Sequence, residues 1–258
     1  MNRIETLFQT KQQNILNVYC TAGYPLPGST LEVMLALQEG GADMIELGMP
    51  YSDPLADGPV IQQSSAVAIQ NGMTIQKMFD QLLDFRHKVY LPVLLMGYMN
   101  PVLQFGFERF CQQAAANAID GIILPDLPLY EFETEYGAHM RKYGLSFVFL
   151  ITPETSEERI RKIDELSSGF IYAVSSSSTT GKNIDMTHQE AYFQRLQAMK
   201  LRNPVLVGFG IKDRPTFQSA CRYANGAIIG SAYIKALQQA ETDRTIAEVT
   251  KEFLGEIV

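Results

Sequence analysis

The sequence predicts an α/β protein: a closed (β/α)8 barrel with one extra helix at its N-terminus. Apolar runs rich in Ile, Val, Leu and Phe alternate with helical patterns along the whole chain. The runs are continuously apolar, which is typical of parallel strands buried on both faces. The length of 258 residues suits one such barrel. An open doubly wound sheet is the alternative, but it more often stops at five or six strands.

Eight strand-like segments recur about every 25–30 residues, the repeat expected of a TIM barrel. They are 16–20, 44–47, 92–96, 121–124, 146–150, 170–174, 205–208 and 227–229. Helical patterns lie between them, for example at 30–38, 75–85, 107–117, 133–142, 157–166 and 214–222. In the last but one of these, Ser156 has the type and position of an N-cap, followed by acidic residues in the first turn. No linker-like or low-complexity stretch divides the chain, so we expect a single domain, residues 1–258.

The extra helix is expected at residues 4–12. Ile4, Leu7 and Phe8 fall on one helical face. Such a helix can cover the closed base of the barrel, where apolar side chains would otherwise meet water. We therefore expect loss of residues 1–12 to lower stability more than activity.

Composition excludes several classes of function. A net charge of −7 with no basic cluster argues against a nucleic-acid partner. No apolar run has the length of a membrane span, and no N-terminal signal pattern is present. The scattered Cys20, Cys111 and Cys221 form neither a disulfide framework nor a metal site. We therefore expect a cytoplasmic protein with no metal and no membrane contact.

The segment 43–59, DMIELGMPYSDPLADGP, carries the strongest chemical signal. Active sites of such barrels are built from the loops that follow the strands, and the segments 48–59, 97–105 and 175–185 are rich in Gly, Pro, Ser and Asp. Glu46 interrupts an apolar run, where a charge is costly unless the site uses it. Asp57 follows on the loop, although a loop Asp is often only a cap or turn residue. Together they can supply two differently tuned acid/base groups.

A second signal indicates a phosphate. Thr180-Gly181, Gly208-Phe209-Gly210 and Gly230-Ser231 offer small residues and backbone donors after late strands. Backbone N–H groups near a helix N-terminus bind phosphate well, and barrels often place that site after strands seven and eight. A lone GFG is more often a tight turn. Two consecutive signals favour a phosphorylated small molecule.

These residues resemble the family of tryptophan synthase alpha subunits. The resemblance runs from about residue 44 to residue 231 and is strongest in ELGMPYSDPLADGP, residues 46–59. Supporting matches are 21–25, 100–101, 125–128, 180–181, 208–211 and 230–232. The resemblance implies a barrel lyase that cleaves indole-3-glycerol phosphate to indole and glyceraldehyde 3-phosphate in L-tryptophan biosynthesis. It also implies an α2β2 complex with a beta subunit, which holds pyridoxal phosphate, and no cofactor on this chain.

The resemblance also implies roles for single residues. Glu46 corresponds to the proton shuttle, and Asp57 to the group that accepts a hydrogen bond from the indole N–H. Burial would raise the pKa of Glu46, whereas Asp57 on its loop should stay ionised. Further matching positions line the indole pocket or the phosphate site: Tyr19, Leu124, Tyr172, Gly181, Phe209, Gly210, Gly230 and Ser231. For Tyr172, plain core packing is an equally good interpretation.

The loop 175–185, SSSSTTGKNID, resembles the family's mobile lid, in which Thr180 contacts Asp57 on closure. Ser178-Thr179 replaces the Gly-Val of many relatives, and Gly97 stands where a bulkier residue is common. The loop 49–59 and residues 100–105 are the expected beta-subunit contacts.

Two other functions remain open at this point. Another phosphate-binding barrel enzyme of tryptophan biosynthesis is possible, but a ring-closing synthase would need lysines at strand ends, where this chain shows none. A ligand-binding regulatory subunit with little activity of its own is the second. The presence of both Glu46 and Asp57 argues against it.

Overall fold

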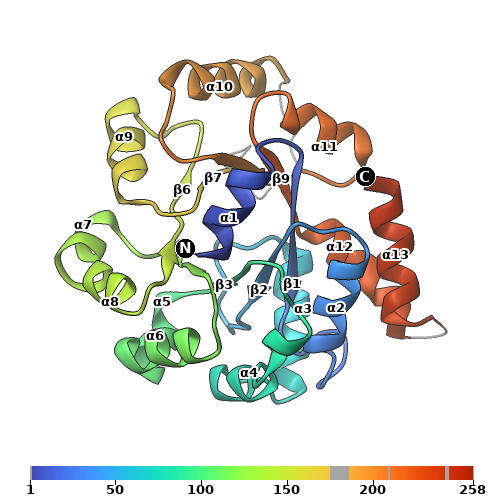
Figure 1. Cartoon of the computed structure of the whole chain (residues 1–258). Helices are drawn as coiled ribbons and strands as arrows, with labels where there is room; N and C mark the ends of the chain where they lie inside the picture. Colours follow the sequence, from blue (N-terminus) through green and yellow to red (C-terminus); the bar gives the residue numbers. More distant parts are fainter. Residues whose placement is uncertain (1, 175–185, 209, 242–243, 258) are drawn as a thin grey trace.

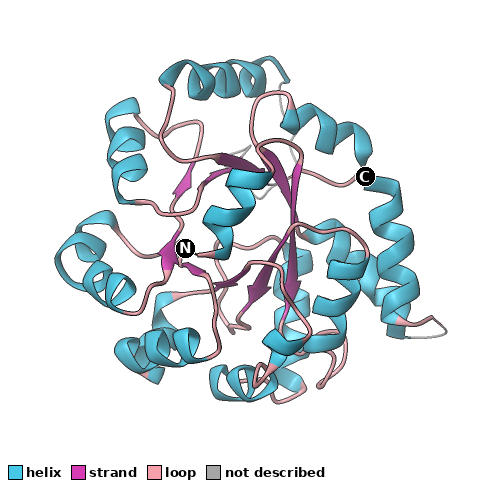
Figure 2. Ribbon diagram, in the orientation of Figure 1, coloured by secondary structure: helices cyan, strands magenta, loops and turns pink. Residues whose placement is uncertain are grey.

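The computed structural model of the chain describes residues 2–174, 186–208, 210–241 and 244–257. Within these ranges, nine parallel strands form a ring that is surrounded by helices (Figures 1 and 2). The predicted (β/α)8 fold class is confirmed. The strands are β1 Ile15–Thr21, β2 Met44–Gly48, β3 Val93–Met96, β4 Gly121–Ile123, β5 Ser146–Phe147, β6 Leu150–Ile151, β7 Ile171–Val174, β8 Val205–Gly208 and β9 Gly226–Ile229.

The expected fifth strand, 146–150, is divided into β5 and β6. Its first half pairs with β4, where Gly121 lies beside Ser146, and its second half pairs with β7, where Leu150 lies beside Tyr172. The sheet order β5-β4-β3-β2-β1-β9-β8-β7-β6 therefore begins and ends on the same chain segment. The segment 146–151 thus completes the ring, because it pairs first with β4 and then with β7.

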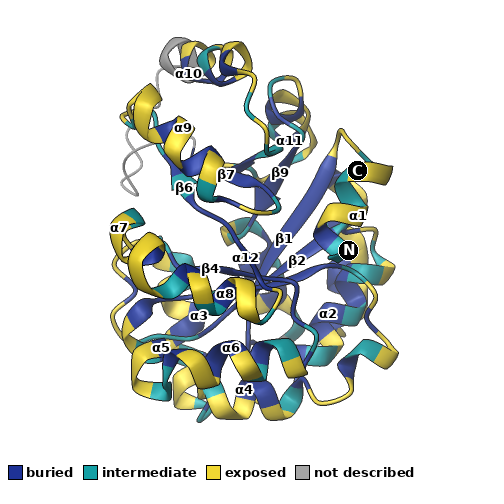
Figure 3. Ribbon diagram, turned by 60° about the vertical axis from the view of Figure 1, so that its left-hand side comes forward, coloured by how far each residue is buried: buried dark blue, intermediate teal, exposed yellow. Residues whose placement is uncertain are grey.

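The helices cover the outside of the ring (Figure 3). Those before β5 are α1 Arg3–Thr10, α2 Thr30–Glu39, α3 Pro59–Gln70, α4 Ile75–Gln81, α5 Met99–Phe105, α6 Phe107–Ala116, α7 Leu129–Glu131 and α8 Gly137–Lys142. Those after β6 are α9 Glu157–Leu166, α10 Met186–Met199, α11 Arg214–Cys221, α12 Ser231–Leu237 and α13 Ile246–Ile257. Short 3-10 turns lie at Phe85–His87 and Gln238–Glu241, and a π-helical turn at Phe132–Tyr136 joins α7 to α8.

Two expected segments differ from the structure. The helix predicted at 75–85 ends at Gln81, because Asp84 takes a left-handed conformation with φ of 59°. The segment 97–105 was expected to be loop, but Met99–Phe105 is helical. Both Asp126 carboxylate oxygens accept the Met99 N–H at 3.0 Å, which satisfies a free donor at the start of the helix. Pro101 is tolerated there because it lies in the first turn.

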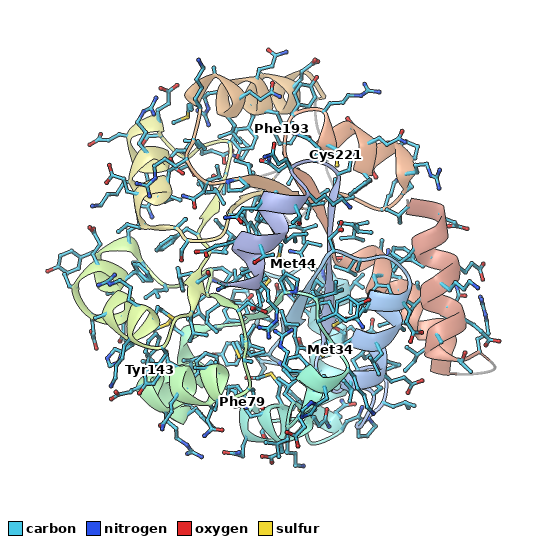
Figure 4. All side chains as sticks on the ribbon, in the orientation of Figure 1. Met34, Met44, Phe79, Tyr143, Phe193 and Cys221 are labelled. Carbon is cyan, nitrogen blue, oxygen red and sulfur yellow. The ribbon has the colours of Figure 1, made fainter. Side chains whose placement is uncertain are left out.

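Side chains alternate between two apolar layers along each strand. One layer lies between the ring and the helices, and the other fills the ring itself. Met44 belongs to the inner layer and is labelled near the centre of Figure 4, whereas Phe79 and Tyr143 lie toward the periphery. The same alternation turns Glu46, two residues after Met44, into the interior.

The extra N-terminal helix, α1, lies across the ring (Figure 1). Ile4 is fully buried in the inner layer, where Leu7 and Phe8 pack beside it, with the Phe8 and Phe170 rings 6.2 Å apart. Asn2 caps the helix, and its side chain donates to the Asp120 carbonyl and the Ser146 hydroxyl at the amino ends of β4 and β5. The predicted helix therefore covers the base of the barrel.

Candidate functional site

A cavity of about 470 Å³ opens at the carboxyl ends of the strands. Its lining combines apolar side chains with two carboxyl groups, two tyrosines and two lysines. The lining residues are Tyr19, Glu46, Asp57, Ile61, Met96, Tyr172, Gly210, Ile211, Lys212, Ile228, Gly230, Ser231, Ala232, Lys235 and Phe253. Seven of the eleven site residues predicted from the sequence thus line this one cavity.

Glu46 lies in the middle of β2, and only 1% of it is exposed. Its Oε1 accepts a hydrogen bond of 2.6 Å from the Asn17 side-chain amide, and among the described residues its Oε2 has no partner. Burial raises the pKa of Glu46 to about 8, and the Asn17 hydrogen bond opposes that rise. At neutral pH the carboxyl group is therefore mostly protonated.

Asp57 precedes α3 and is only partly buried. Desolvation raises its pKa to about 6, and a hydrogen bond with the Tyr98 hydroxyl opposes the rise. Tyr98 also accepts the Ala56 N–H at 3.0 Å, so it fixes the loop that carries Asp57. Asp57 is therefore mostly ionised at neutral pH, although its pKa lies closer to neutrality than that of an ordinary loop aspartate.

Tyr19 lies on β1 and Tyr172 on β7, and each side chain crosses a glycine of a neighbouring strand, Gly48 of β2 and Gly208 of β8. A Cβ atom on Gly48 would lie 2.0 Å from the Tyr19 hydroxyl, and one on Gly208 would lie 2.3 Å from the Tyr172 hydroxyl. These glycines therefore leave room for the tyrosine rings. Burial raises the pKa of both hydroxyls well above the ordinary range, so both remain neutral donors.

One end of the cavity carries the residues expected to bind phosphate. Gly210 follows β8, Gly230 follows β9, and Ser231 is the first residue of α12. Lys212 and Lys235 line the same cavity from a loop and from α12. A phosphate there would meet backbone donors and two ammonium groups.

Other predicted positions are not brought to this cavity or are not described. Leu124 is buried in the outer apolar layer and does not line the cavity. Thr180, Gly181 and Phe209, like the whole lid segment 175–185, lie outside the described residues.

Sequence reasoning missed Asn17, Tyr98 and Lys235. Asn17 offered one signal, a polar amide inside an apolar strand-like run. Tyr98 follows the third strand on the active side of the barrel. Lys235 gave no signal, because a lysine on an exposed helix is ordinary.

Within the described residues, no group of three His, Cys, Asp or Glu side chains could hold a metal ion. Among the same residues, no helix is long and apolar enough to cross a membrane.

The fold, with a cavity at the carboxyl ends of its strands, is that of a barrel enzyme whose active site lies at this face. A family model described as "Tryptophan synthase alpha chain" matches residues 6–257. The chain belongs to this family.

Individual relatives agree with the family match. A tryptophan synthase alpha chain from Flavobacterium johnsoniae is 50% identical over 258 residues, which is the whole of both chains. One from Parabacteroides distasonis is 49% identical over 243 residues, 94% of this chain and 95% of that one. The crystal structure of the alpha subunit from Legionella pneumophila str. Paris has a TM-score of 0.90 and 33% identity, covering 100% of this chain and 97% of that one. A chain of the tryptophan synthase complex from Pyrococcus furiosus has a TM-score of 0.85 and 36% identity, covering 96% and 98%.

Proposed function

We propose that this chain is a carbon–carbon lyase that cleaves indole-3-glycerol phosphate to indole and glyceraldehyde 3-phosphate, with Glu46 as proton shuttle and Asp57 as the acceptor for the indole N–H. The observation that carries the assignment of roles is the pair of carboxyl groups in one cavity with different pKa values, about 8 and about 6. A single barrel domain, residues 1–258, is proposed to contain the whole site.

The reaction needs one proton delivered and one removed. Protonated Glu46 donates to the indole C3, which makes that carbon a leaving group. The side-chain hydroxyl then loses its proton as its oxygen forms the aldehyde, and the carbon–carbon bond breaks with its electrons returning to the indole ring. Glu46 as carboxylate takes that second proton, so the enzyme ends as it began.

Asp57 acts on charge rather than on protons. The indole nitrogen becomes positive when C3 is protonated, and an ionised carboxylate stabilises that charge through the N–H. The apolar lining, with Ile61, Met96 and Ile228, suits the indole ring and strengthens the interaction by excluding water. We assign Tyr19 and Tyr172 to the same indole pocket, and we propose that Leu124 supports it from the outer layer.

The glycerol phosphate portion is assigned to the opposite end of the cavity. Gly210, Gly230 and Ser231 are proposed to donate backbone and hydroxyl hydrogen bonds to the phosphate, joined by Gly181 and Phe209. Thr180 and the segment 175–185 are proposed to close the site over bound substrate.

A beta subunit is the proposed partner, in an α2β2 complex, and it carries the pyridoxal phosphate that acts on the released indole. Its proposed docking surface is a groove of about 520 Å³ lined by the loop after β2, by α5, and by residues of α3 and α4. The exposed Leu55 lies on that loop. Asn100 donates to the Tyr51 hydroxyl at 3.1 Å, and the Tyr51 ring lies 5.3 Å from that of Tyr98, which holds the Asp57 loop. Docking is therefore expected to act on Asp57 through these tyrosines.

The cytoplasm is the proposed location.

The test is indole release from indole-3-glycerol phosphate by the purified chain, with and without a beta subunit. Glu46→Gln and Asp57→Asn should each lower the rate by at least ~10²-fold, the lower end of general acid–base contributions. The kcat/KM profile should rise through about pH 6 as Asp57 ionises and fall through about pH 8 as Glu46 loses its proton. A folded Asp57→Asn variant should lose the acidic limb. Near-normal turnover by either folded variant would refute its role, and no release under any condition would favour a regulatory subunit.

A further inference from the structure

Asn17 is a buried amide in an apolar layer. It lies in β1 between Ile15 and Tyr19, and none of its surface is exposed. In the sheet it pairs with Met44 on β2 and with Ile228 on β9, and both belong to the inner apolar layer. A primary amide in such surroundings costs free energy unless it is hydrogen-bonded.

The Asn17 side chain makes one described hydrogen bond, and it goes to Glu46. Asn17 Nδ2 donates to Glu46 Oε1 at 2.6 Å. In the described structure, the two remaining buried oxygens of this pair, Asn17 Oδ1 and Glu46 Oε2, have no partner. Within the described residues, the only hydrogen bond of either side chain is therefore the one that joins them.

The other titratable groups near Glu46 do not replace this contact. Tyr19 and Cys20 on β1, and Tyr172 on β7, feel the charge of Glu46 and are neutral at neutral pH because burial raises their pKa values. Asp57 acts on the same tyrosines. Lys212 and Lys235 line the cavity, but neither is among the causes that shift the pKa of Glu46. Asn17 is the side chain that holds the carboxyl group.

A primary amide can hydrogen-bond a carboxyl group in both its ionised and its protonated form. Its N–H donates to a carboxylate, and its oxygen can accept from a protonated carboxyl group after rotation about the terminal side-chain bond. With Oε1 held by Asn17, the unpartnered Oε2 remains available for proton exchange with substrate.

We propose that Asn17 is the positioning residue that orients the Glu46 carboxyl group and hydrogen-bonds it in both of the protonation states that cleavage requires. This inference rests on the proposed function, and it adds a residue that does not touch the reacting atoms.

The experiment compares Asn17→Leu, similar in size but without polar atoms, and Asn17→Asp, similar in shape but without a donor when ionised. Assays use the chain together with its beta subunit. Both variants should lower kcat by about tenfold or more, as expected for a lost hydrogen bond to a charged group, while KM changes little. The alkaline limb of the pH–rate profile should move to higher pH in both, because the bond that stabilises the Glu46 carboxylate is absent. Ser146→Ala is the control, since it removes a buried strand hydroxyl at the opposite end of the barrel, and it should leave the limb in place.

A second readout does not depend on turnover. Titration of the Glu46 carboxyl carbon by 13C NMR, assigned with Glu46→Gln, should show a higher pKa in both variants than in the unmodified chain. If Asn17→Leu does not fold, Asn17→Asp decides the question. An unmoved titration, with kcat within about twofold of the unmodified chain, would overturn the inference. Absence of indole release by the unmodified complex would instead overturn the proposed function, and the titration would still decide whether Asn17 holds Glu46.

Discussion

Asp120 and Glu46 are both buried carboxyl groups of the barrel, yet their surroundings are opposite. Asp120, 3% exposed at the amino end of β4, forms ion pairs with Arg3 at 3.1 Å and Arg86 at 2.5 Å and accepts the Val93 N–H at 2.9 Å. Glu46, 1% exposed, has one neutral donor. The carboxylate held by two guanidinium groups and an N–H joins separate elements of the fold, whereas burial without a cation partner raises the pKa of Glu46 to about 8. Burial alone therefore does not separate a structural carboxyl group from a reactive one; its partners do.

Of the substitutions that test this difference between Glu46 and Asp120, replacement of Glu46 should have the largest effect. Besides the loss of cleavage, Glu46→Gln should raise stability at alkaline pH. The native pKa of about 8 exceeds the unfolded value near 4.5, so the native state binds more protons between these values. The free energy of unfolding of the unmodified chain therefore falls as pH rises through that window.

Urea unfolding at pH 5 and pH 8 measures the effect. The gain from Glu46→Gln should be small at pH 5 and larger at pH 8. An equal gain at both values would show that Glu46 is not held protonated.

Asp120→Ala should lower stability and leave activity unchanged, the opposite of the outcome expected for Glu46→Gln. It leaves Arg86, whose side chain is 14% exposed, with carbonyl partners but no ion-pair partner, and breaking a buried pair costs about 3 kcal/mol. The midpoint of denaturant unfolding should fall, while indole release per folded molecule stays near normal. A loss of activity without a loss of stability would contradict the structural role of Asp120.

Gly208→Ala tests the packing that shapes the reactive end. The new methyl group would overlap the Tyr172 hydroxyl at 2.3 Å and its ring carbons at 2.4 and 2.5 Å. Overpacking costs about 1–3 kcal/mol, and displacement of the ring into the cavity should raise KM by about tenfold. Adding Tyr172→Phe should not restore binding, because the ring carbons remain. Adding Tyr172→Ala should relieve the overlap, and an unchanged KM in Gly208→Ala would refute the contact.

Arg3→Gln should have the smallest effect. Arg3 pairs with the same carboxylate as Arg86, but its side chain is 42% exposed, and pairs that contact water contribute about 0–1 kcal/mol. Thermal unfolding of Arg3→Gln beside Arg86→Gln would sharpen the comparison. A larger loss from Arg3→Gln would show that α1 depends on this pair more than its exposure indicates.

The strands were predictable because buried parallel strands are apolar throughout, so Val205–Gly208 could be bounded from sequence alone. The helix α5 was not, because it begins with a contact from Asp126, a residue 27 positions later. For the site, Glu46 and Asp57 lie in a dense local motif, and the structure brings both to one cavity. Asn17 and Tyr98 act through partners 29 and 42 positions away, and such pairing is set by strand register and loop packing rather than by local pattern.

The placement of β1 has a consequence for how a cell makes this protein. Residues 15–21 lie between β2 and β9, so the first strand to leave the ribosome needs the last one as its second neighbour. The intervening residues 22–225 take roughly 10–40 s to translate at about 5–20 residues per second. During that time an apolar strand edge of the nascent chain is unpaired, the kind of surface that aggregates or is taken up by chaperones. The time for which the edge of β1 is exposed to aggregation is therefore set by the speed of translation.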